Sequence, residues 1–283
     1  GYDLNGIKVT YIAAPTLSSA ANVVGGVKVT WNAVDGVGYY NVYRKTGSGD
    51  WTRIASNVAG TSYTDAGPVS ANKVEHYNYA VACSVNGTEM SAHDDTGVDT
   101  TFYQAPKLGS ATSTEAGVTV TWNASDGITE YSLWRKVNGG SWTEIVPSIT
   151  STGSTISYDD ASVTSNNTYT YTVRCKVSGN LVSGYNATGV STFYLAAPAL
   201  VSATAGTKSV TVTWQSVNGA TSYDVYRKTD LNSEWGIVKA GAGGTSYTDT
   251  GLTSGVVYYY TVVAKNDDGR SNFVHAGISA TAK

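Results

Sequence analysis

One pattern of residues occurs three times along this chain of 283 residues, and the repetition limits the fold more than any other feature. Each copy has a segment of alternating apolar and polar residues that ends in tryptophan, followed by a tyrosine-rich segment that ends in Arg-Lys. The tryptophans are Trp31, Trp122 and Trp214, so the period is 91 or 92 residues. A period of this length is one complete small domain, whereas solenoid repeats are only about 20–50 residues long. Each copy is long enough to close its own core, so we expect three tandem domains.

The apolar residues within each copy follow a period of two, which predicts β-strands. In the segment Val27–Trp31, apolar residues alternate with Lys28 and Thr30, so one face is buried and the other faces water. Turn dipeptides such as Asp35-Gly36 follow, and they recur about every 8–12 residues. No segment shows a helical period of useful length. The sequence therefore predicts an all-β fold in which each copy is an immunoglobulin-like β-sandwich.

Short segments that carry a proline join the copies, at Pro15, Pro106 and Pro198. They are shorter and poorer in Gly and Ser than a flexible tether, so we expect closely coupled neighbours with restricted bending and an elongated array. Asn5–Tyr11 resembles Thr188–Tyr194 at the end of the second copy, which we interpret as the tail of a preceding repeat or a leader strand. The predicted boundaries are 1–12 for this leading segment and 13–103, 104–195 and 196–283 for the three domains.

Composition excludes several classes of partner. Only 14% of the residues are charged and the net charge is −3, so the chain is not expected to attract nucleic acid or an anionic membrane. No run of about 18 apolar residues is present, which argues against membrane insertion of this chain.

The two cysteines predict a packing role rather than a reactive one. Cys83 and Cys175 occupy equivalent positions in the first two copies, and Ala264 takes that position in the third. A position that accepts Cys or Ala is a small buried apolar site. Because the two cysteines lie one full domain apart, we do not expect an intrachain disulfide.

The copies resemble fibronectin type III domains, especially those of bacterial secreted and wall-attached proteins. The resemblance rests on the Trp of the second strand, a Tyr-x-Val core in the third and a Tyr-x-Tyr-x-Val pattern near the sixth. The spacing from Val163 to Tyr169, which the third copy repeats, is similar to the family's tyrosine corner, where a hydroxyl pins the preceding connection. In the first copy the corresponding spacing, from Val69 to Tyr77, is two residues longer. The resemblance implies an extracellular protein, secreted or attached to the cell wall.

The sequence shows no arrangement typical of catalysis or metal binding. The three histidines fall at unrelated positions of the repeat, and none has a Cys or His at metal-ligand spacing. We interpret the adjacent carboxylates as solubilising residues of hairpins: Asp94-Asp95, Asp159-Asp160 and Asp267-Asp268. Calcium at the domain junctions is the alternative, but no Asp-x-Asp-x-Asp-Gly loop supports it. We predict no enzymatic activity, no catalytic residue, no metal site and no cofactor.

Aromatic residues are the remaining candidates for recognition. Strand alternation predicts that one aromatic residue of each third strand faces solvent, and a tryptophan follows shortly after in each copy. These candidate binding residues are Tyr43, Trp51, Trp134, Trp142, Tyr226 and Trp235. Exposed aromatic pairs on a sheet stack against sugar rings or anchor a protein partner. The structural alternative is that the tryptophans lie over neighbouring arginine or lysine side chains, and we favour it because the pattern recurs in all copies.

Two functions remain open from the sequence. The first is a non-catalytic spacer, stalk or accessory segment of a bacterial secreted or cell-surface protein. The second is an adhesion module that binds carbohydrate or a host protein through the aromatic sheet faces or loops. In both cases we expect a monomer whose partner is a protein or a polysaccharide.

Overall fold

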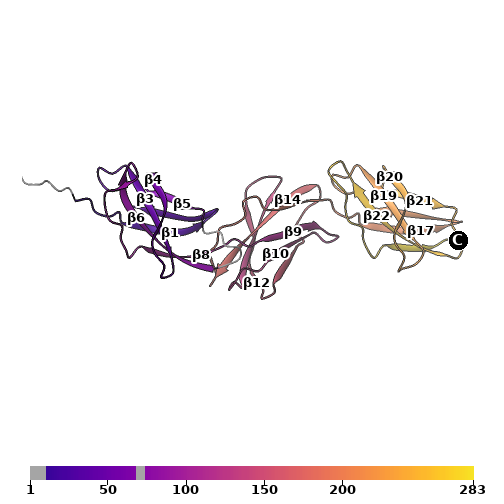
Figure 1. Cartoon of the computed structure of the whole chain (residues 1–283). Helices are drawn as coiled ribbons and strands as arrows, with labels where there is room; N and C mark the ends of the chain where they lie inside the picture. The colour runs from indigo at the N-terminus through magenta and orange to yellow at the C-terminus, as the bar shows by residue number, and fades with distance from the viewer. Residues whose placement is uncertain (1–10, 68–73) are drawn as a thin grey trace, which may run out of the picture.

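The computed structural model describes residues 11–67 and 74–283 (Figure 1). These residues form 23 strands and no helix, which confirms the all-β prediction. Figure 1 shows three groups of strands that follow one another in a row, in the order of the chain. Most of the predicted leading segment 1–12, and most of the longer connection before Tyr77, lie outside the described residues.

The first group of strands forms a sandwich of two antiparallel sheets. One sheet has the order β1-β2-β5, and the other has the order β4-β3-β6, with β7 and β8 pairing with β6. The bounds are β1 Leu17–Val23, β2 Gly26–Trp31, β3 Tyr39–Thr46, β4 Thr52–Ala59, β5 Ser62–Asp65, β6 Val74–Val85, β7 Thr88–Glu89 and β8 Val98–Tyr103.

The second and third groups repeat this strand order. In the second, the sheets are β9-β10-β13 and β12-β11-β14, with β15 and β16 on β14. In the third, they are β17-β18-β21 and β20-β19-β22-β23. The bounds of the second are β9 Leu108–Ser113, β10 Val118–Asn123, β11 Glu130–Val137, β12 Thr143–Thr150, β13 Thr155–Asp160, β14 Asn167–Val177, β15 Asn180–Leu181 and β16 Val190–Tyr194. Those of the third are β17 Leu200–Gly206, β18 Ser209–Trp214, β19 Ser222–Lys228, β20 Gly236–Ala242, β21 Ser246–Thr250, β22 Val257–Lys265 and β23 Ile278–Thr281.

Each sandwich closes its own core, because the period-two pattern turns the same face of every strand inward. In β10, Val118, Val120 and Trp122 are buried, while Thr119 and Thr121 between them are half-buried. The three large clusters of buried residues each draw on strands of one sandwich only. No core is therefore shared between different thirds of the described chain.

The ends of the sandwiches overlap slightly in the chain. Tyr103 directly follows Phe102, which packs in the first core, but Tyr103 itself packs against the second. Leu195, which we place in the second domain from the sequence, is fully buried in the third core. The boundaries at 103/104 and 195/196 stay predictions, and the structure shows that side chains at these points belong to the following core.

The tyrosine corners lie where the spacing predicts them. The hydroxyl of Tyr169 accepts a hydrogen bond of 2.7 Å from the backbone N–H of Thr164, and that of Tyr258 accepts one of 3.0 Å from Thr253. Each bond holds the connection that leads into the long strand β14 or β22. In the first sandwich the Tyr77 hydroxyl donates to the carboxylate of Glu75, and most of the longer connection before it lies outside the described residues.

The cysteines are free and buried, as the comparison of the copies predicts. Cys83, Cys175 and Ala264 are each fully buried at the same position of their sandwiches. Burial raises the pKa of the Cys175 thiol, which keeps it protonated and unreactive at neutral pH.

Because the cores are separate, damage to one should leave the others intact. We predict that Trp122→Ala removes about 3–5 kcal/mol from the second sandwich, the usual cost of deleting a buried tryptophan side chain. Calorimetry should show one unfolding transition moved to lower temperature and the rest unchanged. Trp31→Ala should shift a different transition, and a uniform shift of all transitions would contradict separate cores.

Candidate functional site

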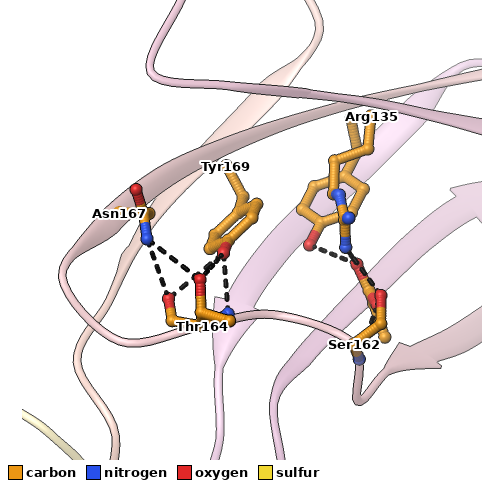
Figure 2. A network of polar contacts seen from close by, with 7 residues as sticks. Arg135, Ser162, Thr164, Asn167 and Tyr169 are labelled. Atoms are coloured by element: carbon orange, nitrogen blue, oxygen red, sulfur yellow. Dashed lines mark hydrogen bonds and ion pairs between the residues drawn. The ribbon is translucent and has the colours of Figure 1, made fainter. Parts of the chain in front are cut away.

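A buried polar contact links the two sheets of every sandwich. In the second, Nη1 of Arg135 on β11 donates to Oδ2 of Asp160 on β13 at 2.6 Å, and the hydroxyl of Tyr171 on β14 donates to the same oxygen at 2.9 Å (Figure 2). Asp160 belongs to the three-stranded sheet, whereas Arg135 and Tyr171 belong to the facing sheet. The contact therefore holds the sheets in one register. It recurs with the same geometry in Arg44, Asp65 and Tyr79 and in Arg227, Asp249 and Tyr260.

This contact corrects one interpretation made from the sequence. We expected Asp159-Asp160 to be a pair of solubilising residues, but Asp160 is only 3% exposed, and Asp159 alone faces outward. Sequence reasoning missed the contact, although an Asp lies two residues after a Tyr in the same strand of each copy and an Arg recurs in each third strand. Its role is structural, because the carboxylate oxygen is saturated by protein donors.

The Asp160 carboxylate is held in its charged form. Burial alone would raise its pKa, but hydrogen bonds from Ser162, Arg135 and Tyr171 outweigh burial and lower the pKa below its ordinary value. The same contact, together with burial, raises the pKa of Tyr171 far above its ordinary value, so the phenol stays neutral and remains a donor.

The six aromatic candidates lie two to each sandwich, on the outer face of its larger sheet, which is turned away from the core. Tyr43, Trp134 and Tyr226 lie on the third strands and point outward, opposite to the buried Arg–Asp contact. The solvent exposure expected for Tyr43 is wrong in detail: it is only 8% exposed, because His93 stacks on it with ring centroids 4.8 Å apart. Trp134 and Tyr226 remain half-buried.

The tryptophans Trp51, Trp142 and Trp235 occupy one structural position in the three sandwiches. A lysine ammonium lies over each ring: Lys45 at 4.6 Å, Lys136 at 4.8 Å and Lys228 at 4.5 Å from the ring centroids. The edge of each indole also rests against the glycine directly before the last strand, Gly97, Gly189 or Gly277. A Cβ there would come within 3.0 Å of the indole, and these glycines have positive φ. The three tryptophans therefore have a recurring packing role, and the covering cation is lysine rather than arginine.

Contacts between successive sandwiches form a second recurring feature. At the second joint, Nδ2 of Asn272 donates to the carbonyl of Ser113 at 2.8 Å, and the backbone N–H of His275 donates to the carboxylate of Glu115 at 3.0 Å. At the first joint, Gly184 packs so closely that a Cβ would lie 2.5 Å from the carbonyl oxygen of Val23. In both cases the loop before the last strand rests on the first hairpin of the preceding sandwich.

The two joints use the same loop position. The residue before Gly184 is Ser183, whose hydroxyl accepts from the backbone N–H of Cys175, and the residue before Asn272 is Ser271, which accepts from Ala264 in the same way. This internal bond fixes the loop before it meets its neighbour. A cavity of about 160 Å³ remains at the first joint, and its lining includes the aromatic residues Phe102, Tyr103 and Tyr185.

Neither a metal centre nor a membrane span emerges from the described part of the chain. No group of three or more His, Cys, Asp or Glu side chains comes together in residues 11–67 and 74–283. Within the same residues, no helix is long and apolar enough to cross a membrane.

Comparison with known proteins finds similarity to parts of two longer enzymes. No protein-family model matches it. Exoglucanase B of Cellulomonas fimi is 29% identical over 95% of this chain, and Chitinase A1 of Niallia circulans is 29% identical over 88%. The chain spans only 26% and 38% of the length of these relatives. A solved two-domain fibronectin type III segment of chicken tenascin is 18% identical and covers 62% of this chain and 97% of that one, with a TM-score of 0.34.

The polar link between the sheets makes a prediction about acid stability. Because folding lowers the pKa of Asp160, the carboxylate stabilises the second sandwich above its ordinary pKa of 3.8, and this stabilisation is lost as the pH falls below that value. Asp160→Asn should cost about 2–3 kcal/mol at pH 7, since it leaves Arg135 without its charge partner near the interior. The free energy of unfolding of this sandwich should also depend less on pH in the variant than in the wild type between pH 2 and about 5, measured by denaturant titration. An unchanged pH dependence would show that Asp160 is not responsible for the loss of stability in acid.

The first joint can be tested without disturbing a core. Gly184→Ala places a Cβ against Val23 and should loosen the joint. The free energy of unfolding of the second sandwich should stay within about 0.5 kcal/mol of the wild-type value. Distances between spin labels on the first and second sandwiches should then spread over a wider range. Gly38→Ala, where a Cβ meets nothing within 4 Å, is the matched control. Equal distance distributions in both variants would mean that the contact does not restrict the joint.

Proposed function

We propose that this chain, a tandem array of fibronectin type III domains, is a non-catalytic spacer or accessory segment of a bacterial secreted or cell-surface protein. The observation that carries the proposal is the repeated joint, in which a pre-fixed loop of one sandwich rests on the preceding one. Joints of this kind limit bending, so each added sandwich lengthens the array instead of folding back on it. A row of three sandwiches then holds the parts of a longer protein apart.

The relatives support an accessory role in a polysaccharide-degrading protein. These relatives are an exoglucanase and a chitinase, and the matched region is a minor part of each. An array that fills such a part serves the enzyme by spacing or by holding substrate, while the reaction belongs to other parts. The extracellular setting, the monomeric state and the absence of catalysis in this chain belong to the same proposal.

The adhesion module remains the second candidate, and one observation favours it for one sandwich only. In the second sandwich the outer face carries two indoles beside an arginine side chain, with a small cavity between them. The faces of the other two sandwiches are closed by packed rings.

Small-angle scattering tests the spacer proposal directly. A compact globule of 283 residues has a radius of gyration of about 19 Å, so an extended array should give a clearly larger value and a scattering profile typical of a rod. The profile should be independent of protein concentration if the chain is a monomer. A radius of gyration near that of the compact globule would overturn the proposal.

A further inference from the structure

We infer that the outer face of the second sandwich holds a shallow subsite for one ring of a neutral, β-linked polysaccharide. A cavity of about 80 Å³ opens on this face between Trp134, Trp142, Thr172, Arg174 and Tyr185. The inference does not rest on the spacer role, because an array that binds no sugar is still a spacer.

Two residues at this cavity, Arg174 and Trp134, occur in the second sandwich only. Arg174 precedes the buried Cys175, and the residues at this position in the other copies are Ala82 and Val263. Trp134 is likewise replaced by a tyrosine in both. The combination of a second indole and a guanidinium therefore occurs once, on a backbone that is otherwise repeated.

The corresponding faces of the other sandwiches are occupied by their own side chains. In the first, His93 stacks on Tyr43 with an angle of 22° between the rings. In the third, Phe273 packs on Tyr226 at 6.0 Å, and Arg270 donates to the tyrosine hydroxyl at 3.0 Å. In the second, the ring at this loop position, Tyr185, turns toward Trp142 instead, at 6.0 Å and an angle of 71°. Within the described residues, Trp134 therefore has no aromatic ring stacked on it.

Trp134 is held in place before any ligand arrives. Its indole Nε1 donates to the hydroxyl of Ser132 at 2.9 Å, and Ser132 is fully buried. Fixing the ring in advance reduces the entropy lost on binding. A fixed, half-buried indole is a platform on which the C–H face of a pyranose ring can lie.

Polar groups at the rim suit the hydroxyls of a neutral sugar. Nε and Nη2 of Arg174 donate to the carbonyl of Ser183 at 3.0 and 2.8 Å, which anchors the guanidinium and leaves the rest of its five N–H donors for a ligand. Arg174 has no carboxylate within 4 Å in the described part of the chain. Glu144, opposite Trp134 on the neighbouring strand, is exposed and supplies an acceptor on the same face.

The volume of the cavity and its combination of hydrogen-bond donor and acceptor indicate the class of ligand. A cavity of about 80 Å³ is too small to enclose a hexose, so the ring lies on Trp134 and one of its substituents enters the cavity. The Arg174 donor and the Glu144 acceptor lie on the same face, so a neutral sugar, whose hydroxyls both donate and accept, is favoured over an acidic one. β-Linked glucose and N-acetylglucosamine fit because their equatorial substituents leave flat C–H faces. Such a shallow contact predicts a dissociation constant on the order of 1 mM.

The test uses substitutions that the scaffold already accepts. Cellotetraose and chitotetraose are titrated into the full chain, and binding is followed by the NMR shift of the indole N–H of Trp142, which lines the same cavity and is kept in every variant. We expect saturable shifts with at least one of them. Trp134→Tyr and Arg174→Val introduce the residues that the other copies carry, so folding is kept, and each should weaken binding at least about tenfold.

Val263→Ala in the third sandwich is the matched control and should bind like the wild-type chain. No shift with either sugar up to its solubility limit would overturn the inference, as would wild-type affinity in both Trp134→Tyr and Arg174→Val. The scattering profile of the wild-type chain decides the spacer proposal separately, so the two can fail independently.

Discussion

The contact of one carboxylate with an arginine and a tyrosine of the facing sheet organises each sandwich. Because side chains alternate along a strand, turning Arg135 inward to Asp160 commits Trp134 and Lys136 to the outer face. A buried ion pair is weak evidence for net stability, and its clearer consequence here is a fixed register between the sheets. The same register in all three copies explains why their outer faces carry aromatic and lysine side chains at matching positions.

Comparison of the three sandwiches distinguishes residues that the fold needs, which occur in all of them, from residues that occur in only one. The tryptophan over a positive-φ glycine occurs in all three sandwiches, so it belongs to the scaffold. Arg174 and Trp134 occur in one sandwich, next to a cavity, so they are not needed to close the fold. The joints show the same division, since the loop position is repeated while the contacting residue changes from Gly184 to Asn272.

Much of the fold could be predicted because it depends on local patterns. Alternation in Val118–Trp122 predicts a strand with one buried face, and the spacing from Val163 to Tyr169 predicts the tyrosine corner. The polar link at Asp160 could not be predicted with the same ease, because its partners lie 25 and 11 residues away on other strands. The burial of Tyr43 depended on His93, which comes from a loop 50 residues further along the chain.

The sequence by itself determined the all-β fold, the repeat period and the small buried position of Cys83 and Cys175, since each follows from residue type and spacing along one strand. Only the tertiary structure decided which aromatic rings stay accessible, how neighbouring sandwiches touch, and that Asp160 is buried while Asp159 is not. These outcomes depend on contacts between strands and loops far apart in the chain. The geometry of these contacts is determined when the two sheets pack together, so it cannot be predicted from a local sequence pattern.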